Sequence, residues 1–402
     1  MQSRAPSLPP LSPAAPSQTR AIVFLAVAGF ASQCMVRSAD SLLPQIAEDF
    51  HVVVGVASII VSGYTLVHGS MQLFMGPIGD RFGKYRTCAV ICACAAVFVA
   101  LCGLAPSLFT LTLARLGSAA FASWIIPLGM AYVGDVVPYE RRQPVLARYL
   151  SGQVSGQLFG QAAGGVLGDL IGWRGVFFVL AAFLALAALG LAREFAINPL
   201  THAAAATAPR SRGLIADNKV VLSNPWARFI IMAAAIEYMF MFGAFAYVGA
   251  DLRLRFGLSF TTIGLVICMF GVGGLIYTVA APLFVGGLGQ RGLAMWGGFI
   301  AAGAYVLLAA APVWWVTPVI VIFVGLGFYM LHNTLQTNAT QMSPEARGTA
   351  VGIFSAALYL GQTAGVALAA PVIDRHGAQP AFIAAAVVLF LLGIWLGRRL
   401  KK

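Results

Sequence analysis

The chain has 402 residues, of which 60% are hydrophobic and only 9% are charged, and its mean hydropathy is +0.87. Soluble domains carry roughly 25% charged residues, so this composition excludes a water-soluble enzyme. A membrane-crossing helix needs about 20 mostly apolar residues, and the hydrophobic content is sufficient for about twelve of them. The residues that remain are too few for an attached catalytic or nucleotide-binding domain.

Residues 1–20 contain five prolines and no long apolar segment, which predicts a disordered tail rather than a cleavable signal peptide. The apolar segments that follow predict six membrane spans before a polar stretch and six after it. The expected spans are 21–44, 53–75, 87–105, 108–133, 148–171, 175–192, 226–250, 262–285, 293–311, 317–341, 349–371 and 380–397. We therefore expect two six-helix domains, 21–192 and 226–397, a cytoplasmic linker, 193–225, and a basic tail, 398–402.

The basic residues are unevenly distributed between the two sides that these spans define. Of the 25 Arg and Lys residues, Arg37 and Arg115 lie deep inside spans and four lie in the loops after odd-numbered spans. The other 19 lie on the opposite side, in the tails, in the other loops or at the span ends that face them. Basic residues are enriched on the cytoplasmic side of membrane proteins, so both termini are predicted to be cytoplasmic. The net charge of +12 thus follows from membrane topology and does not indicate a nucleic-acid partner.

The second half of the sequence is similar to the first when the numbering is shifted by about 205 residues. The shift aligns Gly156, Gln157, Gly160, Asp169, Gly172 and Phe177 with Gly361, Gln362, Gly365, Asp374, Gly377 and Phe382. One further residue of shift aligns Gly83, Pro138 and Arg141 with Gly289, Pro344 and Arg347. Because six is even, both halves have the same orientation, an arrangement in which two bundles rock about a midplane site. The expected fold is an all-α membrane protein of twelve helices in two pseudo-symmetric six-helix bundles.

The loop after the second expected span combines an acid, glycines and basic residues in the segment Gly76-Pro-Ile-Gly-Asp80-Arg81-Phe-Gly83-Lys84-Tyr-Arg86. This segment resembles the cytoplasmic signature of the major facilitator superfamily, G-x-x-x-D-(R/K)-x-G-(R/K)-(R/K), with Tyr85 replacing one basic residue. Glycine lets helices approach closely, and an acid can face the N-terminus of a neighbouring helix. The resemblance implies a conformational latch formed by Gly76, Asp80, Arg81, Gly83, Lys84 and Arg86. The corresponding segment of the second half, 281–291, has no acid.

Other segments are similar to motifs of the twelve-span drug:proton antiporters of this superfamily. Asp40-Ser-Leu-Leu-Pro44 is similar to their D-x-x-x-P motif at the end of span one, and Arg115 resembles the arginine motif of span four. The fifth span resembles the antiporter motif G-x-x-x-G-P-x-x-G-G, with glutamine in place of proline, through Gly156, Gly160, Gln161, Gly164 and Gly165. The resemblance covers the chain from residue 21 onward and implies the major facilitator fold and proton-coupled antiport.

Ionisable residues inside the spans are costly to insert into a bilayer, so Arg37, Asp40, Arg115 and Glu237 must face the protein interior. Arg37 and Asp40 are three residues apart and share one helical face. Arg115 lies at a depth that is compatible with pairing to Asp40. We interpret these three residues as a proton-coupling group, with a purely structural ion pair as the alternative.

Glu237 lies near the middle of the seventh expected span, among bulky apolar residues. A carboxylate there loses its hydration, so it needs a proton, a cation or a hydrogen-bond donor. The tenth span carries polar residues at a similar depth, and Gln157 belongs to a row of glutamines on span five. These side chains either line a substrate cavity or join helices by hydrogen bonds. The candidate substrate-binding residues are Glu237, Tyr238, His332, Asn333, Gln336 and Gln157.

Motifs of enzymes are weak or missing. Gly287-Leu-Gly289-Gln-Arg-Gly292 has the spacing G-x-G-x-x-G but connects two expected spans and follows no strand, and the sequence contains no P-loop and no H-E-x-x-H. The six cysteines lie in apolar stretches, and the span that carries Cys88, Cys92 and Cys94 contains no His or acidic residue. We expect no cofactor, no metal site and no enzymatic activity.

The sequence therefore predicts a secondary active transporter of a bacterial inner membrane, most simply a proton-coupled exporter of a small amphipathic or cationic organic compound. One alternative is a proton-coupled importer of an organic anion or another small metabolite, with Arg37 and Arg115 binding a carboxylate. A second alternative is a membrane sensor that transports nothing. The expected partners are a small-molecule substrate, protons and the lipid bilayer, and we expect a monomer.

Overall fold

The structure is a computed structural model that describes residues 16–74, 82–202, 214–343 and 347–400, nearly all of them helical. The first half comprises α1 (Pro16–Asp49), α2 (Val54–Ala57), α3 (Ile59–Gln72), α5 (Lys84–Leu104), α6 (Leu108–Ala122), α7 (Ile125–Val136) and α8 (Tyr139–Ile197). A connecting region contains η1 (Pro199–His202) and α9 (Leu214–Ser223). The second half comprises α10 (Pro225–Phe245), α11 (Val248–Phe256), α12 (Phe260–Ala310), η2 (Trp314–Val316), α13 (Thr317–Ala339), α14 (Arg347–His376) and α15 (Gln379–Arg399).

Eleven helical segments among the described residues are long and apolar enough to cross a membrane. One of them, Gly152–Ile197, has 46 residues, which is about twice the length that a bilayer requires. Gly172 interrupts it with a φ of 69°, so this segment contains two spans and the total is twelve. The all-α fold of twelve transmembrane helices is confirmed.

Glycines at equivalent positions of the two halves make the same turns. Gly83 and Gly289 have φ values of 84° and 61°, and Gly172 and Gly377 have values of 69° and 75°. Positive φ is strained for residues with a side chain, and only glycine adopts it readily. Glycine is therefore retained in both halves because each half turns between successive spans at these points.

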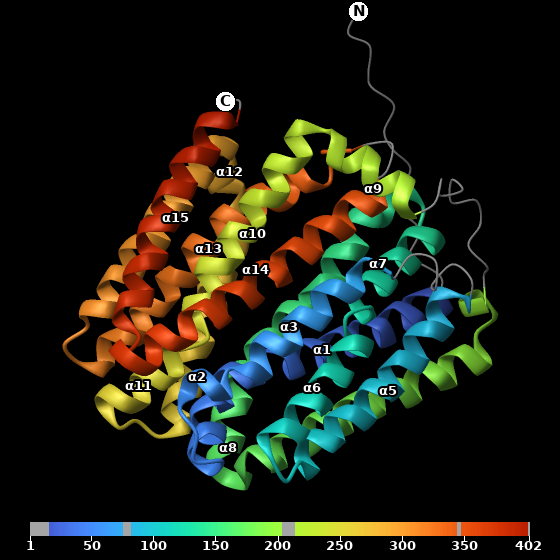
Figure 1. The fold of residues 1–402 in the computed structure, drawn as a ribbon. Coiled ribbons are helices and arrows are strands. Elements are labelled where there is room, and N and C mark those ends of the chain that lie inside the picture. The colour runs from blue at the N-terminus through green and yellow to red at the C-terminus, as the bar shows by residue number, and fades with distance from the viewer. Residues whose placement is uncertain (1–15, 75–81, 203–213, 344–346, 401–402) are drawn as a thin grey trace, which may run out of the picture.

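The helices form two bundles that touch along two seams (Figure 1). In the first half α1 and α5 pack along α8, and in the second half α12 packs against α13 and α15 while α10 packs against α14. Between the halves, α8 packs against α12, and α3 packs against α14. Buried apolar residues from both halves belong to one continuous core, so the seams are close-packed.

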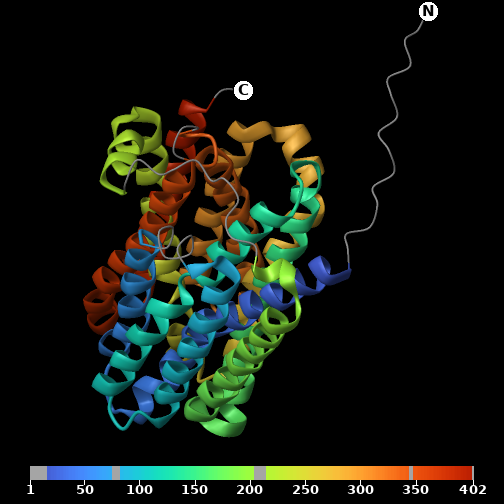
Figure 2. The same ribbon diagram turned by 90° about the vertical axis from the view of Figure 1, so that its right-hand side faces the viewer.

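The molecule has two distinct ends. In Figure 1, α9 and the C-terminal end of α15 lie at the top, whereas α2 and α11 lie at the bottom. Figure 2 shows the same separation after the turn, with α9 and the C-terminal end of α15 again at the top. We call these ends the α9 face and the α2–α11 face.

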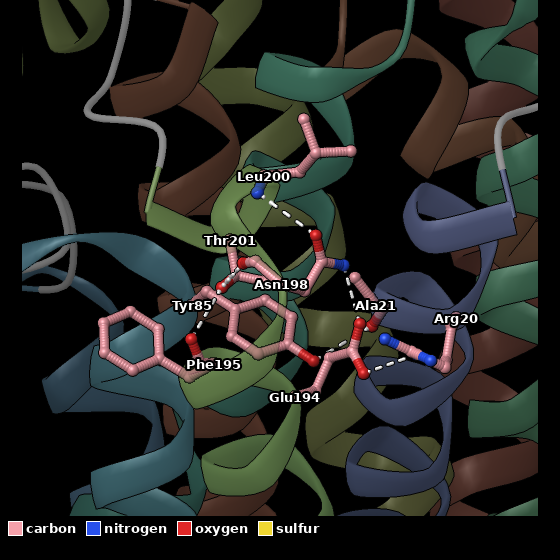
Figure 3. Close-up of polar contacts among 8 residues, drawn as sticks. All are labelled: Arg20, Ala21, Tyr85, Glu194, Phe195, Asn198, Leu200 and Thr201. Carbon is pink, nitrogen blue, oxygen red and sulfur yellow. Dashed lines mark hydrogen bonds and ion pairs between the residues drawn. The ribbon is translucent and has the colours of Figure 1, made fainter.

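A buried polar cluster near the α9 face ties the start of α1 to the end of α8 (Figure 3). Nε of Arg20 lies 2.6 Å from Oε2 of Glu194, whose side chain is only 1% exposed. Nδ2 of Asn198 donates to Oε1 of Glu194 at 2.6 Å, and the side-chain oxygen of Asn198 accepts from the Leu200 amide at 3.1 Å. Both carboxylate oxygens are satisfied, so the cluster fixes the first turns of α1 against α8. The helix begins at Pro16, ahead of the expected residue 21.

Candidate functional site

The candidate site lies where α1 of the first half meets α10 of the second. On α1, Nη1 of Arg37 lies 3.5 Å from Oδ2 of Asp40, and both side chains are buried. The spacing of three residues on one helix brings the two groups together, as the sequence predicts. At 3.5 Å the contact is an ion pair at the limit of hydrogen bonding, so neither group is held by a short bond.

Arg37 also touches the opposite half. Its guanidinium carbon lies 4.1 Å from the ring centroid of Phe242 on α10, a cation–π distance. Nε of Arg37 and Oδ2 of Asp40 are buried and have no hydrogen-bond partner among the described residues. A buried polar atom without a partner is costly, so this pair is poised to accept a water molecule, a proton or a ligand group.

Arg115 does not contact Asp40. Its Nη1 donates to the backbone oxygen of Met35 at 3.3 Å, and its guanidinium carbon lies 4.3 Å from the ring centroid of Tyr64. The side chain is only 1% exposed, yet no ion pair joins it to a described residue. The expected depth was compatible with pairing, but the guanidinium is held by a backbone carbonyl and an aromatic face, both of which stabilise a buried cation.

Glu237 and His332 form a second acid–base pair, between α10 and α13. Nδ1 of His332 lies 2.8 Å from Oε2 of Glu237, and the exposed fractions of the two side chains are 13% and 0%. The His332 ring also stacks on Phe328, with centroids 4.9 Å apart and an interplanar angle of 15°. The imidazole is thus fixed by the carboxylate and by Phe328, and it is the member of the pair with exposed surface.

Aromatic rings connect the two pairs. Tyr238 lies 4.8 Å from Phe242 and 5.4 Å from His332, measured between ring centroids. Because Phe242 carries the Arg37 guanidinium, a continuous aromatic surface runs from one pair to the other. We call Arg37, Asp40, Glu237, Tyr238, Phe242 and His332 the central site. It offers two acid–base pairs and flat apolar rings, a combination suited to amphipathic compounds.

The other candidate residues lie outside this group. Nδ2 of Asn333 donates to the hydroxyl of Tyr277 on α12 at 2.7 Å, so it joins two helices of the second half. Gln336 is exposed, and Gln157 is partly buried with its Nε2 unpartnered among the described residues. None of the three has a polar contact with a member of the central site within the described chain.

His68 was not among the residues expected from the sequence. It lies on α3 at the seam between the halves, 4% exposed, with its ring centroid 4.3 Å from that of Tyr359 on α14. The ring of Tyr64, one turn earlier, stacks on the His68 ring with centroids 5.5 Å apart. The Nδ1 atom of His68 has no hydrogen-bond partner among the described residues. The sequence signal that could have identified His68 is a polar residue four positions after a tyrosine within an apolar span.

The glycines of the antiporter-like motif are packing positions. A Cβ atom on Gly156 or Gly160 would collide with the backbone of α1, and one on Gly165 would collide with Gly264 of the second half. Gln161 is fully buried, and its backbone oxygen accepts from the hydroxyl of Ser41 on α1 at 3.0 Å. Gly164 likewise faces α1, at Ser38 and Ser41. The motif therefore lets α8 approach both α1 and the opposite half.

Only part of the latch segment can be placed. Gly76, Asp80 and Arg81 lie outside the described residues. Gly83 precedes α5, and Nζ of Lys84 lies 2.5 Å from Oδ2 of Asp135 on α7, while Arg86 is exposed. In the described part of the chain, no group of three or more His, Cys, Asp or Glu residues could hold a metal ion.

The comparisons with known proteins agree with this architecture. The family model of the Major Facilitator Superfamily matches residues 25–345 and 248–402. An uncharacterised transporter of this superfamily from Bacillus subtilis, YceJ, is 24% identical over 371 residues, 90% of this chain and 91% of the relative. A lincomycin resistance protein from Streptomyces lincolnensis is 34% identical over 112 residues, 28% of this chain and 23% of that protein.

A solved structure shares the fold. The bacterial homologue of the human lysosomal transporter Spinster, in an inward-facing and unoccupied conformation, superposes with a TM-score of 0.74 at 17% identity and covers 96% of this chain and 98% of its own. At this level of identity the likeness concerns the fold alone. With the match to the family model, it shows that the chain belongs to the major facilitator superfamily and is a membrane transporter, not an enzyme.

Proposed function

We propose that the protein exports a small amphipathic or cationic organic compound across a bacterial inner membrane in exchange for protons, with the α9 face in the cytoplasm. The observation that carries this proposal is the buried Arg37–Asp40 pair, which has unpartnered polar atoms and touches the second half through Phe242. A titratable carboxyl at a contact between two rocking bundles can couple protonation to their movement.

In this proposal Asp40 is the proton carrier. When the carboxyl is ionised, the Arg37 cation stabilises it; when it is protonated, the guanidinium loses its partner and keeps only the Phe242 ring. Movement of α10 relative to α1 changes the environment of Arg37 and so changes which form of Asp40 is favoured. Proton loading on one side and release on the other follow from this coupling.

The Glu237–His332 pair and the aromatic rings form the proposed substrate region. An ionised Glu237 carboxylate behind the His332 ring would favour a cationic ligand, while Tyr238 and Phe328 offer flat surfaces for stacking. Because Glu237 has no exposed surface, it acts through His332 and is a positioning residue. The candidates Asn333, Gln336 and Gln157 remain proposals for the periphery of the substrate path.

Import of an organic anion is the second candidate. The observation that favours it is that Nε of both Arg37 and Arg115 is buried and unpartnered among the described residues. Two guanidinium groups near one helix could bind a carboxylate through charge-assisted hydrogen bonds. The partial similarity to a resistance protein and the antiporter-like glycines of α8 support export instead.

The test begins with ligand identification. Purified protein is melted in the presence of ethidium, lincomycin or benzoate, since a ligand that binds the folded state raises the melting temperature. A ligand that stabilises the protein is then offered to everted and right-side-out vesicles with an imposed proton gradient. Export predicts accumulation in everted vesicles, and accumulation only in right-side-out vesicles would support import.

Two variants separate coupling from binding. Asp40→Asn should abolish gradient-driven accumulation while the ligand-dependent melting shift persists. Asp49→Asn is the matched control, because Asp49 is also an acid of α1 but lies at its exposed end, paired with Arg174 at 2.6 Å. Equal activity of the two variants would contradict the role of Asp40.

A further inference from the structure

Asp169 and Asp374 occupy equivalent positions in the two halves, 205 residues apart. Asp169 precedes the Gly172 turn on α8, and Asp374 lies near the end of α14. Both lie toward the α2–α11 face and both side chains are exposed. Neither residue belongs to the central site, and the proposed function assigns no role to them.

Each aspartate accepts a hydrogen bond from a backbone amide of the opposite half. The Thr261 amide, in the first turn of α12, donates to Oδ2 of Asp169 at 2.6 Å. The Gly55 amide, at the start of the span Val54–Gln72, donates to Oδ1 of Asp374 at 2.8 Å. Amides in the first turn of a helix have no acceptor within that helix, so a carboxylate is a favourable partner.

The two contacts are related by the internal repeat. Residues 261 and 55 differ by 206 positions, within one residue of the spacing between the aspartates, so the same contact is made twice with the halves exchanged. Each lies on one seam: Asp169 where α8 meets α12, and Asp374 where α14 meets the start of the second span. A random pair of surface contacts would not follow this symmetry.

Glycines permit the close approach on both seams. A Cβ atom on Gly55 would collide with the Asp374 carboxylate, and one on Gly165 would collide with the backbone of α12. The hydroxyl of Tyr247 also donates to Oγ of Ser58 across the halves at 2.9 Å, and Ser58 is only 2% exposed. The halves are therefore in direct contact at the α2–α11 face.

We propose that Asp169 and Asp374 form a symmetric pair of latches that hold the α2–α11 face closed, and that both bonds break when this face opens. Each carboxylate is fixed to one half and each amide to the other, so separation of the halves leaves both groups to water. The salt bridge between Arg253 and Glu48, at 2.8 Å, also crosses the halves, but its side chains are 33% and 50% exposed. Its two residues are 205 positions apart, so the repeat relates them to each other and gives one contact, not a pair.

The test measures opening directly, without a substrate. Ser58→Cys places a thiol between the halves, and purified protein in lipid nanodiscs is treated with a maleimide while labelled peptides are quantified by mass spectrometry. In this background Asp169→Ala or Asp374→Ala should each raise the labelling rate about fivefold, and the double variant should raise it further. Asp→Asn at either position, which retains an acceptor but removes the charge, should give a smaller increase.

Two controls distinguish opening from unfolding. Asp49→Ala removes an acid near the same face that bonds Arg174 and Trp173 of its own half, so Ser58→Cys labelling should not change. The native Cys88 and Cys92 are fully buried within the first half and should stay unlabelled if the bundles move as rigid bodies. The proposal is overturned if the thiol of Ser58→Cys is labelled no faster in the Asp169 and Asp374 variants than in Asp49→Ala. It is also overturned if that thiol is labelled faster only when Cys88 and Cys92 become labelled as well.

Discussion

The two halves of the molecule each bring one buried acid–base pair to the central site, and the pairs are built differently. In the first half Arg37 and Asp40 lie on a single helix, at 3.5 Å, and reach the other half through Phe242. In the second half Glu237 and His332 come from two helices, at 2.8 Å, and stay within their own bundle.

This difference assigns proton coupling to one pair and ligand recognition to the other in our proposal. The loose pair at the contact between the bundles is sensitive to their relative movement, which suits proton coupling. The short pair within one bundle keeps its geometry when the bundles rock, which suits recognition of a ligand by a fixed imidazole. Two bundles of similar fold can thus carry out different tasks. One pair lies at the contact between the bundles, and the other lies within a single bundle.

The largest effect should come from Asp40→Asn, which mimics the protonated carboxyl permanently. Gradient-driven transport in vesicles should fall to background, because the carrier can no longer gain or lose a proton. Glu237→Gln should keep measurable coupling under the same conditions. If both variants lost coupling equally, the proposed division between the halves would be wrong.

Asp80→Asn tests the latch implied by the sequence, which only the first half retains in charged form. We expect turnover to fall about tenfold with little change in ligand affinity, because the latch would stabilise one conformation without touching the ligand. Turnover is followed in vesicles and affinity by melting shifts, at matched expression. Normal turnover of Asp80→Asn would show that the segment 76–86 does not act as a latch in the transport mechanism.

Glu237→Gln should weaken binding of a monovalent lipophilic cation about tenfold, since the negative charge behind His332 is lost. A neutral ligand of similar size should be affected much less. Titration of both ligands against the purified variant checks this. An equal loss for the two would indicate that Glu237 only supports packing.

Arg115→Ala should have the smallest effect on coupling. Arg115 contacts the Met35 carbonyl and Tyr64 rather than Asp40, so its influence on the carboxyl is indirect. We expect the ratio of protons to substrate to change by about threefold or less, with a lower melting temperature from the lost buried contacts. A complete loss of coupling with an unchanged melting temperature would place Arg115 beside Asp40 in the mechanism.

The features that the sequence predicted depend on local spacing. Spans follow from the length of apolar segments, the repeat follows from aligned glycines whose positive φ recurs in both halves, and the Arg37–Asp40 pair follows from a separation of three residues. Contacts between distant segments were not predictable in this way. Glu237 and His332 are 95 residues apart, and Asp169 reaches an amide 92 residues away.

Depth alone also proved insufficient to assign partners. Asp40 and Arg115 share a similar depth, yet the rotation of each helix about its axis directs Arg115 to a carbonyl and a ring. His68 lies at the seam because its side of α3 faces α14, which the sequence does not show. Helix rotation and the choice of neighbour are set by packing over the whole bundle, which single-helix patterns do not contain.

The most direct test of the account is the number of protons released when a ligand binds to purified protein in weakly buffered solution. The account predicts substrate-induced release from the wild type and from Glu237→Gln at saturating ligand, and no release from Asp40→Asn, although all three bind. Release from Asp40→Asn equal to that of the wild type would contradict the account and make Asp40 a packing residue.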